Sequence, residues 1–203
     1  MYFVKTPSII KPLGRDFLWN YSRDKREVYL TFDDGPTPRV TEQVLELLNM
    51  YNAKATFFCI GKNAEQHTKL FQKIRDEGHA TGNHSYSHQD GWKTCTFSYL
   101  KDALRGNEKI QSSLFRPPYG HITLSQASLL KRKFQLVMWD VISGDFDQRI
   151  SKEKCLRNVI ENVQNGSIVV FHDSVKASSN MMFAVERSLK HFTDEGFTLR
   201  AIQ

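Results

Sequence analysis

The stretch Val28-Tyr-Leu-Thr-Phe-Asp-Asp-Gly-Pro36 is an apolar run that ends in two neighbouring carboxylates and a turn. Its first five residues alternate apolar and β-favouring side chains, which predicts a buried strand, and Gly35-Pro36 ends that strand. Asp33 and Asp34 therefore stand at the carboxyl end of a strand. Two adjacent carboxylates repel each other and lose water there, so we expect a cation beside them. The alternative is a simple Asp-Gly turn in which one Asp caps the following helix.

Strands and helices alternate along the remaining chain. After the first strand, Thr37 is expected to be the N-cap and Pro38 the first residue of a helix. Further strands are predicted at residues 55–60, 79–83, 114–116, 135–140, 167–171 and 197–201, and further helices at residues 63–77, 98–113, 125–133, 151–164 and 180–193. Units of ~30 residues have the size of strand-helix-strand elements, and continuously apolar strands predict a parallel sheet covered by helices.

Polar residues that suit catalysis follow several of the predicted strands. They are Asp33 and Asp34 after the first, His84 and His88 after the third, Arg116 after the fourth, Asp140 and Asp145 after the fifth, and His172 and Asp173 after the sixth. In a barrel these strand ends converge on one mouth, whereas an open doubly wound sheet spreads them along an edge. The pattern therefore favours a barrel.

The composition is that of a single globular domain. The chain has 203 residues, a mass of 23.5 kDa and 40% hydrophobic residues, which is enough for one sizeable core. Residues 1–27 contain Pro7, Pro12 and Gly14 and are predicted to form an ordered lead-in packed on a main domain at residues 28–203. Three widely spaced cysteines argue against a disulfide framework or a cysteine metal site, and we expect buried or half-buried thiols at Cys59, Cys95 and Cys155.

The net charge indicates which partners to expect, and the N-terminal residues indicate the cellular location. A net charge of +6 and a pI near 9.2 suit an anionic partner, yet a solvated helix end explains the one compact basic cluster, Lys131-Arg-Lys133, so no nucleic acid is expected. No stretch approaches the length of a membrane-spanning helix, and residues 1–7 lack the pattern of a secretory signal. We therefore expect a cytoplasmic protein, with the cell envelope or secretion as alternatives.

The segment Gly82-Asn-His-Ser-Tyr-Ser-His88 places two imidazoles four residues apart. On a helical turn both rings point the same way and can hold one metal ion. Together with one carboxylate of the Asp pair they predict a metal site of two histidines and one acid, with positions left for water and substrate. The remaining histidines are interpreted as ordinary structural residues, namely His67, His79, His121 and His191.

Five ordered motifs resemble those of the polysaccharide deacetylases, the NodB-homology carbohydrate esterases of family 4. The motifs are Thr31-Phe-Asp-Asp-Gly-Pro36, His84-Ser-x-x-His88, Arg116-Pro-Pro-Tyr119, Asp145-Phe146 and Val170-Phe-His172. The resemblance covers the chain from about residue 28 to its end. It implies an α/β fold, a distorted, incomplete (β/α) barrel of about seven parallel strands. It also implies a divalent metal, usually Zn²⁺ with Co²⁺, Mn²⁺ or Ni²⁺ as alternatives, and the hydrolysis of N-acetyl or O-acetyl groups on sugars.

The resemblance also implies a role for each matching residue. Asp33 is the expected general base, and Asp34, His84 and His88 are the expected metal ligands. Tyr119 is expected to lend its backbone N–H to the oxyanion, His172 to be the general acid, and Arg116 and Asp145 to orient the acid–base groups. The residues expected to contact substrate are Tyr119, Trp92 and Phe146. Two positions depart from the family pattern, because Phe146 stands where a Trp is usual and Val170 where a Leu is usual.

Structural interpretations stand beside several of these roles. Arg116 is alternatively an ion-pair partner of Asp145 or Asp140, and His172 a buried hydrogen-bonded imidazole. Exposed aromatic side chains on loops, such as Trp92, are alternatively packing residues.

The predicted function is the metal-dependent removal of N-acetyl groups from poly- or oligosaccharides that contain N-acetylglucosamine, such as peptidoglycan or chitin-like chains. Alternatives are an O-acetyl esterase acting on xylan-type polysaccharide and an amidohydrolase of small non-sugar amides. A non-enzymatic alternative is a carbohydrate-binding protein on the same fold. The expected partner is an acetylated carbohydrate, and the sequence does not specify an oligomeric state.

Overall fold

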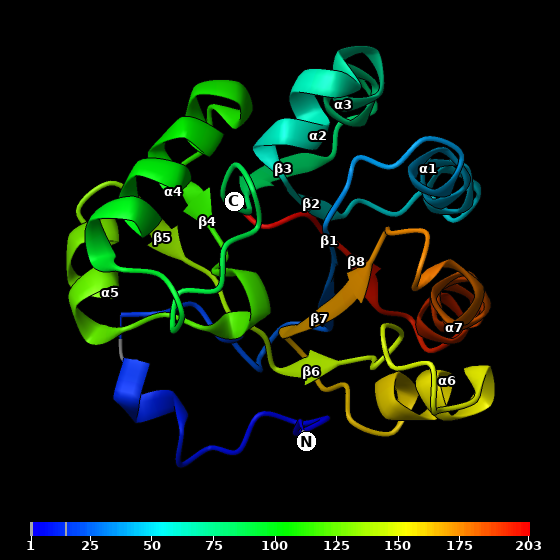
Figure 1. Cartoon of the computed structure of the whole chain (residues 1–203). Helices are drawn as coiled ribbons and strands as arrows, with labels where there is room; N and C mark the ends of the chain where they lie inside the picture. Colours follow the sequence, from blue (N-terminus) through cyan, green and yellow to red (C-terminus); the bar gives the residue numbers. More distant parts are fainter. Residues whose placement is uncertain (1, 15) are drawn as a thin grey trace.

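A parallel β-sheet, curled toward a barrel, forms the centre of the computed structural model, which describes residues 2–14 and 16–203 (Figure 1). The strand order is β5-β4-β3-β2-β1-β7-β6, and the short strand β8 pairs with β1. All pairs between these strands are parallel. The strands are β1 (Glu27–Asp33), β2 (Thr56–Cys59), β3 (Ala80–Asn83), β4 (Leu114–Phe115), β5 (Gln135–Leu136), β6 (Val141–Ile142), β7 (Ser167–His172) and β8 (Thr198–Leu199).

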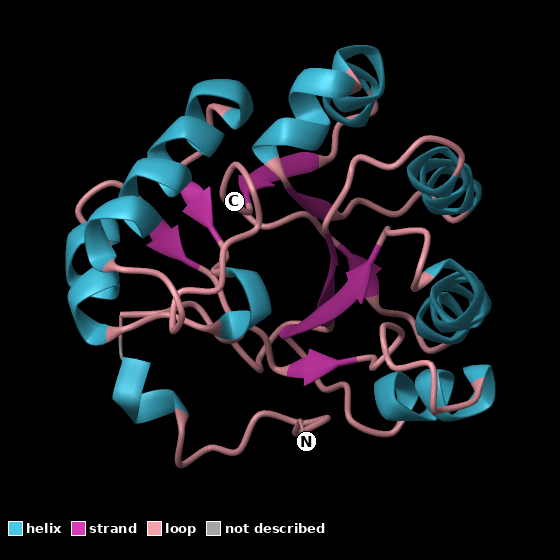
Figure 2. Cartoon of the chain, in the orientation of Figure 1, coloured by secondary structure: helices cyan, strands magenta, loops and turns pink. Residues whose placement is uncertain are grey.

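The helices surround the outside of this sheet (Figures 1 and 2). They are α1 (Val40–Met50), α2 (Gly61–Gln66), α3 (Thr68–Asp76), α4 (Thr96–Ile110), α5 (Leu124–Leu130), α6 (Lys152–Ile160) and α7 (Ser178–Asp194), with 3-10 helices η1 (Lys11–Gly14) and η2 (Pro118–Gly120). β5 and β6 end the strand order on opposite sides although they are consecutive in the sequence, so the sheet does not close. The predicted α/β fold, an incomplete barrel of about seven parallel strands, is confirmed.

The alternation of side chains along β1 separates the main core from the barrel interior. Successive residues of a strand point to opposite faces. The even-numbered residues pack against the helices in the main core; they are Val28, Leu30 and Phe32. Tyr29 belongs to a second cluster on the opposite face, with Phe58 and Ile168. Thr31 and Asp33 lie on this interior face too, so the sequence pattern of β1 directs Asp33 into the barrel.

β7 continues the same layers in register with β1. Tyr29 is paired with Ile168, and four residues later Asp33 is paired with His172. Because paired residues of adjacent strands in this register share a face, Asp33 and His172 lie side by side where both strands end. The register therefore brings two reactive side chains together that are far apart in the sequence.

The N-terminal lead-in lies beside the two ends of the open sheet (Figure 1). Leu18 N–H donates to Leu136 O of β5 at 2.8 Å, and Ile142 N–H of β6 donates to Val4 O at 2.9 Å. These contacts satisfy edge groups of both terminal strands, which an incomplete barrel would otherwise leave unpaired. The division of the chain at residue 27 stays a prediction.

The strand predicted at residues 135–140 is wrong as a single element. Only Gln135 and Leu136 pair with β4, and β6 begins at Val141. Between them the chain crosses from one end of the sheet toward the other: Val137 N–H donates to Phe115 O on β4, whereas Asp140 N–H donates to Ile168 O on β7. The segment is apolar because it is buried, but its backbone partners belong to different strands.

Two predictions about helices also need correction. The helix predicted at 63–77 is divided at His67, whose φ of −121° and ψ of 48° are not helical. α2 is fixed to the β3–α4 loop, since Gly61 N–H donates to Ser85 O, while α3 packs its own apolar face on the core. Thr37 is not the N-cap of α1, because the helix begins at Val40 and the Thr37 N–H donates to the Oγ1 of Thr41.

Two further expectations concern membrane spans and thiols. Among the described residues, no helix combines the length and the apolar character that crossing a membrane requires. The predicted cytoplasmic location stays a prediction. Cys59 and Cys155 are buried free thiols as expected, whereas Cys95 is exposed because it precedes α4 on the surface.

Candidate active site

A cavity of about 430 Å³ opens where the central strands end. Its lining residues include Asp33, Asp34, His84, His88, Tyr119 and His172. Asp33 and His172 are the last residues of β1 and β7, and the others lie in the segments after β1, β3 and β4, so the barrel brings together side chains from four separate parts of the chain.

Asp34, His84 and His88 present three potential ligand atoms to one point. One atom from each residue lies within 4.8 Å of the other two. The Asp34 Oδ1 is 3.1 Å from His88 Nε2 and 3.8 Å from His84 Nε2. Two imidazole nitrogens and a carboxylate oxygen are a donor set that suits Zn²⁺ and similar divalent ions, with coordination positions left open.

The buried polar atoms of this cluster fit a cation. Asp34 Oδ1 is buried and accepts no hydrogen bond from any described residue. Such an atom is costly without a partner. Burial opposes ionisation of Asp34, but the close approach of the His88 imidazole and the positive charge of the nearby imidazoles hold the pKa of this carboxyl well below its usual range. The site thus contains an ionised carboxylate with an unused lone pair directed toward two imidazoles.

The protonation of His84 also suits a ligand. Its Nδ1 lies 2.7 Å from Arg116 O, so Nδ1–H donates to that carbonyl and Nε2 is left with a lone pair facing Asp34. Burial lowers the pKa of His84 to about 4, against smaller opposing effects of Asp33 and Asp34. A metal-binding imidazole must be neutral, and His84 is neutral at physiological pH.

The backbone is strained at three of the site residues. Asp34 has a φ of 81°, His88 of 59° and Tyr119 of 60°. Residues with side chains rarely adopt this left-handed conformation, and each instance costs roughly 1–3 kcal/mol. Strain of this kind is typical of residues whose position matters for function.

Arg116 fixes Asp33. The guanidinium is fully buried, and its NH1 donates to Asp33 Oδ1 at 2.6 Å and to Thr31 Oγ1 at 2.7 Å. Its other nitrogens donate to backbone carbonyls of Val137 and Met138. The alternative prediction that Arg116 pairs with Asp145 or Asp140 is wrong. The extended segment 137–140 places its carbonyls around Arg116, which the sequence pattern did not reveal.

Asp145 fixes His172 in the same way. Its Oδ1 lies 2.8 Å from His172 Nδ1, and its Oδ2 accepts the backbone N–H of His172 at 2.7 Å. Burial lowers the pKa of His172, but the Asp145 carboxylate outweighs this effect and raises the pKa to about 9. The imidazole therefore keeps a proton at neutral pH, and its Nε2–H is free of the Asp145 contact.

Tyr119 lies beside His88 of the metal cluster. It follows Pro117 and Pro118, and its ring contacts His88 with centroids 4.6 Å apart. Among the described residues, no acceptor receives the Tyr119 backbone N–H. Tyr119 is 59% exposed and lines the cavity.

The remaining predicted contact residues are placed differently. Phe146 lines the cavity and packs edge-to-face on His172 with centroids 5.2 Å apart. Trp92 is not among the lining residues; it stacks on His121 with centroids 3.7 Å apart and is 65% exposed. Its contact with substrate stays a prediction.

Sequence reasoning missed several residues of the cavity wall. They include Tyr2, His121, Trp139 and Lys176. Trp139 was assigned to a strand interior, and His121 was interpreted as an ordinary structural residue. One signal was available for His121, since it follows the Arg116-Pro-Pro-Tyr119 motif by only two residues. No sequence pattern pointed to Tyr2.

The fold and the site together define a class of protein: an incomplete α/β barrel with a candidate metal site of two histidines and one carboxylate at its strand ends. The model of the polysaccharide deacetylase family matches residues 20–135. The chain belongs to this family.

Individual relatives agree with this assignment. The chain is 35% identical over 158 residues to a peptidoglycan-N-acetylglucosamine deacetylase of Bacillus cereus; the match covers 74% of this chain and 57% of that protein. A second Bacillus cereus protein of the same name is 31% identical over 186 residues, which cover 88% of this chain and 87% of that protein. The crystal structure of the Bc1960 peptidoglycan N-acetylglucosamine deacetylase superposes with a TM-score of 0.89 at 28% identity, over 97% of this chain and 95% of that one.

Proposed function

We propose that this protein is a metal-dependent hydrolase that removes N-acetyl groups from carbohydrates containing N-acetylglucosamine. The observation that supports this most directly is the arrangement in one cavity of Asp33, His172 and the three-donor cluster. Peptidoglycan is the first substrate to test, since the relatives described above are peptidoglycan deacetylases.

Hydrolysis of an acetamide requires a strong nucleophile, stabilisation of an oxyanion and a proton for the departing nitrogen. Asp34, His84 and His88 would hold a divalent ion, Zn²⁺ in our proposal, and such an ion would supply Lewis acidity for the activation of a water and of the acetyl carbonyl. The chain itself supplies the acid, the base and a hydrogen-bond donor.

Asp33 is the proposed general base. Its carboxylate is 3% exposed and beside the cluster, and Arg116 holds one of its oxygens at 2.6 Å. The second oxygen is available to accept a proton from an attacking water. General bases of this kind accelerate reactions by roughly 10²–10⁴-fold.

His172 is the proposed general acid, and Tyr119 the proposed oxyanion donor. Asp145 binds His172 Nδ1, so the proton on Nε2 faces the cavity and can be transferred to the leaving nitrogen. The Tyr119 N–H can donate to the developing oxyanion, and such a donor is worth about 3–4 kcal/mol in the transition state. Asp33 and His172 lie side by side at the ends of neighbouring strands, so the proposed base and acid can act on the same substrate.

Measurement of acetate release tests this proposal. The zinc-equilibrated protein should release acetate from peptidoglycan or tetra-N-acetylchitotetraose faster than from acetylxylan. Faster release from acetylxylan would favour an O-acetyl esterase, and release only from small acetamides would favour a non-sugar amidohydrolase. Saturable sugar binding without any acetate release would favour a carbohydrate-binding protein.

A further inference from the structure

The N-terminal lead-in reaches the candidate active site. Tyr2 lines the same cavity as Asp33 and His172. It lies outside the part of the chain that the family model matches, which begins at residue 20. A wall of the cavity is therefore formed by a segment that is separate from the recognised motifs.

Backbone pairing with β6 explains how the lead-in arrives there. Lys5 and Val141 form an antiparallel bridge, with Ile142 N–H donating to Val4 O at 2.9 Å. Antiparallel pairing directs the N-terminal end of the lead-in toward the carboxyl end of β6, where the cavity opens. Continued in this register, Tyr2 is opposite Gly144.

Contacts at Gly144 agree with this register. A Cβ atom at Gly144 would lie 2.5 Å from Tyr2 Oη. The close approach of the tyrosine therefore depends on a residue without a side chain, and the φ of 78° at Gly144 also favours glycine.

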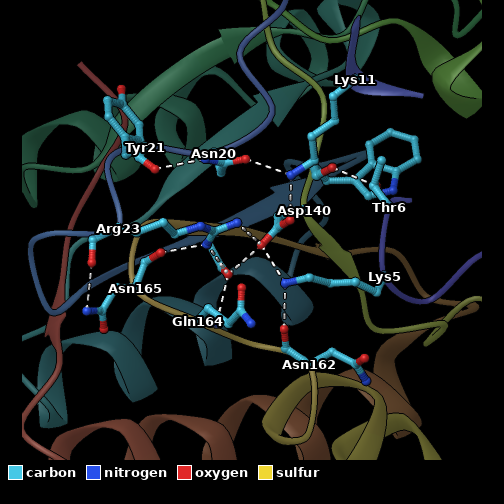
Figure 3. A network of polar contacts seen from close by, with 12 residues as sticks. Lys5, Thr6, Lys11, Asn20, Tyr21, Arg23, Asp140, Asn162, Gln164 and Asn165 are labelled. Carbon is cyan, nitrogen blue, oxygen red and sulfur yellow. Dashed lines mark hydrogen bonds and ion pairs between the residues drawn. The ribbon is translucent and has the colours of Figure 1, made fainter. Parts of the chain in front are cut away.

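A cluster of ion pairs around Asp140 holds the lead-in against the barrel (Figure 3). The Asp140 carboxylate is fully buried, and its oxygens accept from Lys5 Nζ at 2.7 Å, Lys11 Nζ at 2.9 Å and Arg23 NH2 at 2.9 Å. Ser167 Oγ donates to the same carboxylate at 2.6 Å. Charged hydrogen bonds to a buried carboxylate are among the stronger polar contacts, so residues 5–23 are held at three points.

The wall itself is aromatic and adjoins the proposed acid. The Tyr2 and Phe146 rings pack with centroids 5.1 Å apart, and Phe146 packs on His172. The next side chain along the lead-in, Phe3, is 63% exposed. Tyr2 is thus the aromatic residue of this segment that lines the cavity.

We propose that Tyr2, together with Phe146, binds the sugar ring that carries the leaving nitrogen, and that the Asp140 cluster positions Tyr2 for this contact. The C–H face of a sugar ring can pack on an aromatic face, while the tyrosine hydroxyl stays at a polar edge. The location beside His172 is the side of the cavity to which the amine departs. This inference rests on the proposed function, and Tyr2 acts in it as a specificity residue.

Kinetics of Tyr2→Ala, Tyr2→Phe and Phe3→Ala on two substrates test this proposal. Tyr2→Ala should raise the KM for tetra-N-acetylchitotetraose by about fivefold to tenfold, the value of one aromatic contact. Its loss of kcat/KM should be several times smaller on 4-nitrophenyl acetate, which has no sugar ring. Tyr2→Phe keeps the ring and should lose less than Tyr2→Ala on the tetrasaccharide. Phe3→Ala changes an exposed neighbour and should stay within about twofold of the unmodified protein. Equal losses on both substrates would overturn the proposal.

Binding separates this inference from the proposed function. The dissociation constant for tetra-N-acetylchitotetraose is measured by calorimetry with the zinc-loaded Asp33→Asn protein, with and without Tyr2→Ala. We expect about fivefold to tenfold weaker binding without the tyrosine ring, whether or not the unmodified protein releases acetate. Equal binding by the two proteins would overturn the inference. So would an absence of binding by both proteins at about 10 mM sugar, a concentration at which even weak binding is detected. An absence of acetate release with the expected change in binding would overturn only the proposed function.

Discussion

At the scale of single residues, the two carboxylates at the end of β1 have different surroundings and therefore different proposed roles. Asp33 is held by a fully buried arginine, whereas Asp34 has a buried oxygen without a hydrogen-bond partner. Asp33 is the last residue of β1, whereas Asp34 leaves the extended conformation with a φ of 81°. The different surroundings of base and ligand thus follow from the turn that begins at Asp34.

Asp33→Asn should abolish turnover while the metal is retained. The amide cannot accept the proton of the attacking water, so kcat should fall by at least about a hundredfold. Because Arg116 then lacks its countercharge in a buried position, the free energy of unfolding should also fall, by roughly 2–4 kcal/mol. Acetate release, bound zinc by elemental analysis and urea unfolding measure the three effects.

His84→Ala is the matched variant for this test. It should lose bound zinc and turnover together, because one of three donor atoms is removed. Full activity in Asp33→Asn would show that another group is the base, and normal zinc content in His84→Ala would show that the ion binds elsewhere.

The pH dependence of kcat/KM should report the pair His172 and Asp145. The pKa of His172 is raised to about 9, so the protonated acid is present at neutral pH and is lost only as the pH rises through that value. Asp145→Asn removes the charge that raises the pKa while burial continues to lower it. The alkaline limb of kcat/KM should therefore move to lower pH by about two units.

Asp90→Asn is the control for this pH profile. Asp90 Oδ1 lies 3.0 Å from His121 Nδ1, a similar pair on another wall of the cavity. Its removal should leave the alkaline limb in place. An alkaline limb that does not move in Asp145→Asn would exclude His172 as the group that sets it.

At the scale of elements, the sequence predicted what depends on local pattern and missed what depends on distant partners. The alternation in β1 follows from a short-range rule, and it is confirmed. The extended segment 137–140 is apolar like a strand, yet its backbone bonds go to β4, to β7 and to the lead-in. No periodicity within the segment distinguishes these cases.

The residues of the candidate site also fall into two groups, those that a local sequence pattern predicts and those that depend on contacts between distant segments. His84 and His88 were predicted together from their four-residue spacing, but the helical turn expected there is wrong, because the segment is a loop with positive φ at Ser85 and His88. The pairing of Arg116 with Asp33 was not, because it depends on how β4 and β1 face each other across the barrel interior. The contribution of Tyr2 depends on the pairing of two segments more than a hundred residues apart, Lys5 with Val141.

Asp140→Asn should loosen the lead-in. Burial opposes ionisation of Asp140, but hydrogen bonds from Lys5, Ser167 and other donors hold its pKa well below the usual 3.8. Because the pKa of Asp140 is lower in the folded than in the unfolded chain, the ionised carboxylate stabilises the fold when the pH is above the unfolded pKa of 3.8. This contribution is lost as the pH falls below that value. At pH 7 the variant should lose roughly 3 kcal/mol of unfolding free energy, and the difference should shrink in acid. Urea unfolding from about pH 7 down to about pH 2 measures this difference, because the loss begins only below the 3.8 of the unfolded carboxyl.

Asp16→Asn is the matched control in the same segment. Asp16 pairs with Lys131 at 2.8 Å, but both side chains are exposed. Exposed pairs contribute little, so this variant should unfold like the unmodified protein. A loss in Asp140→Asn no greater than in Asp16→Asn would contradict the role of the buried cluster.

At the scale of the whole molecule, the candidate metal site joins parts of the barrel that are not adjacent in the sheet. Asp34 follows β1, whereas His84 and His88 follow β3, and β2 lies between these strands. An ion that binds all three residues links the two loops in the folded state only. It should therefore stabilise the molecule in proportion to its binding.

Zinc should raise the Tm of this protein. A ligand at one hundred times its dissociation constant adds about 2.7 kcal/mol to the free energy of unfolding. For a chain of this size, each 1 kcal/mol corresponds to about 2–4 °C. Removal of zinc by a chelator should thus lower the Tm by roughly 5–10 °C, and added zinc should restore it.

In His88→Ala the chelator should have little effect, because the donor set is incomplete. His191→Ala, on α7 and remote from the cluster, should respond like the unmodified protein. A Tm that does not depend on zinc in the unmodified protein would contradict metal binding by these three residues.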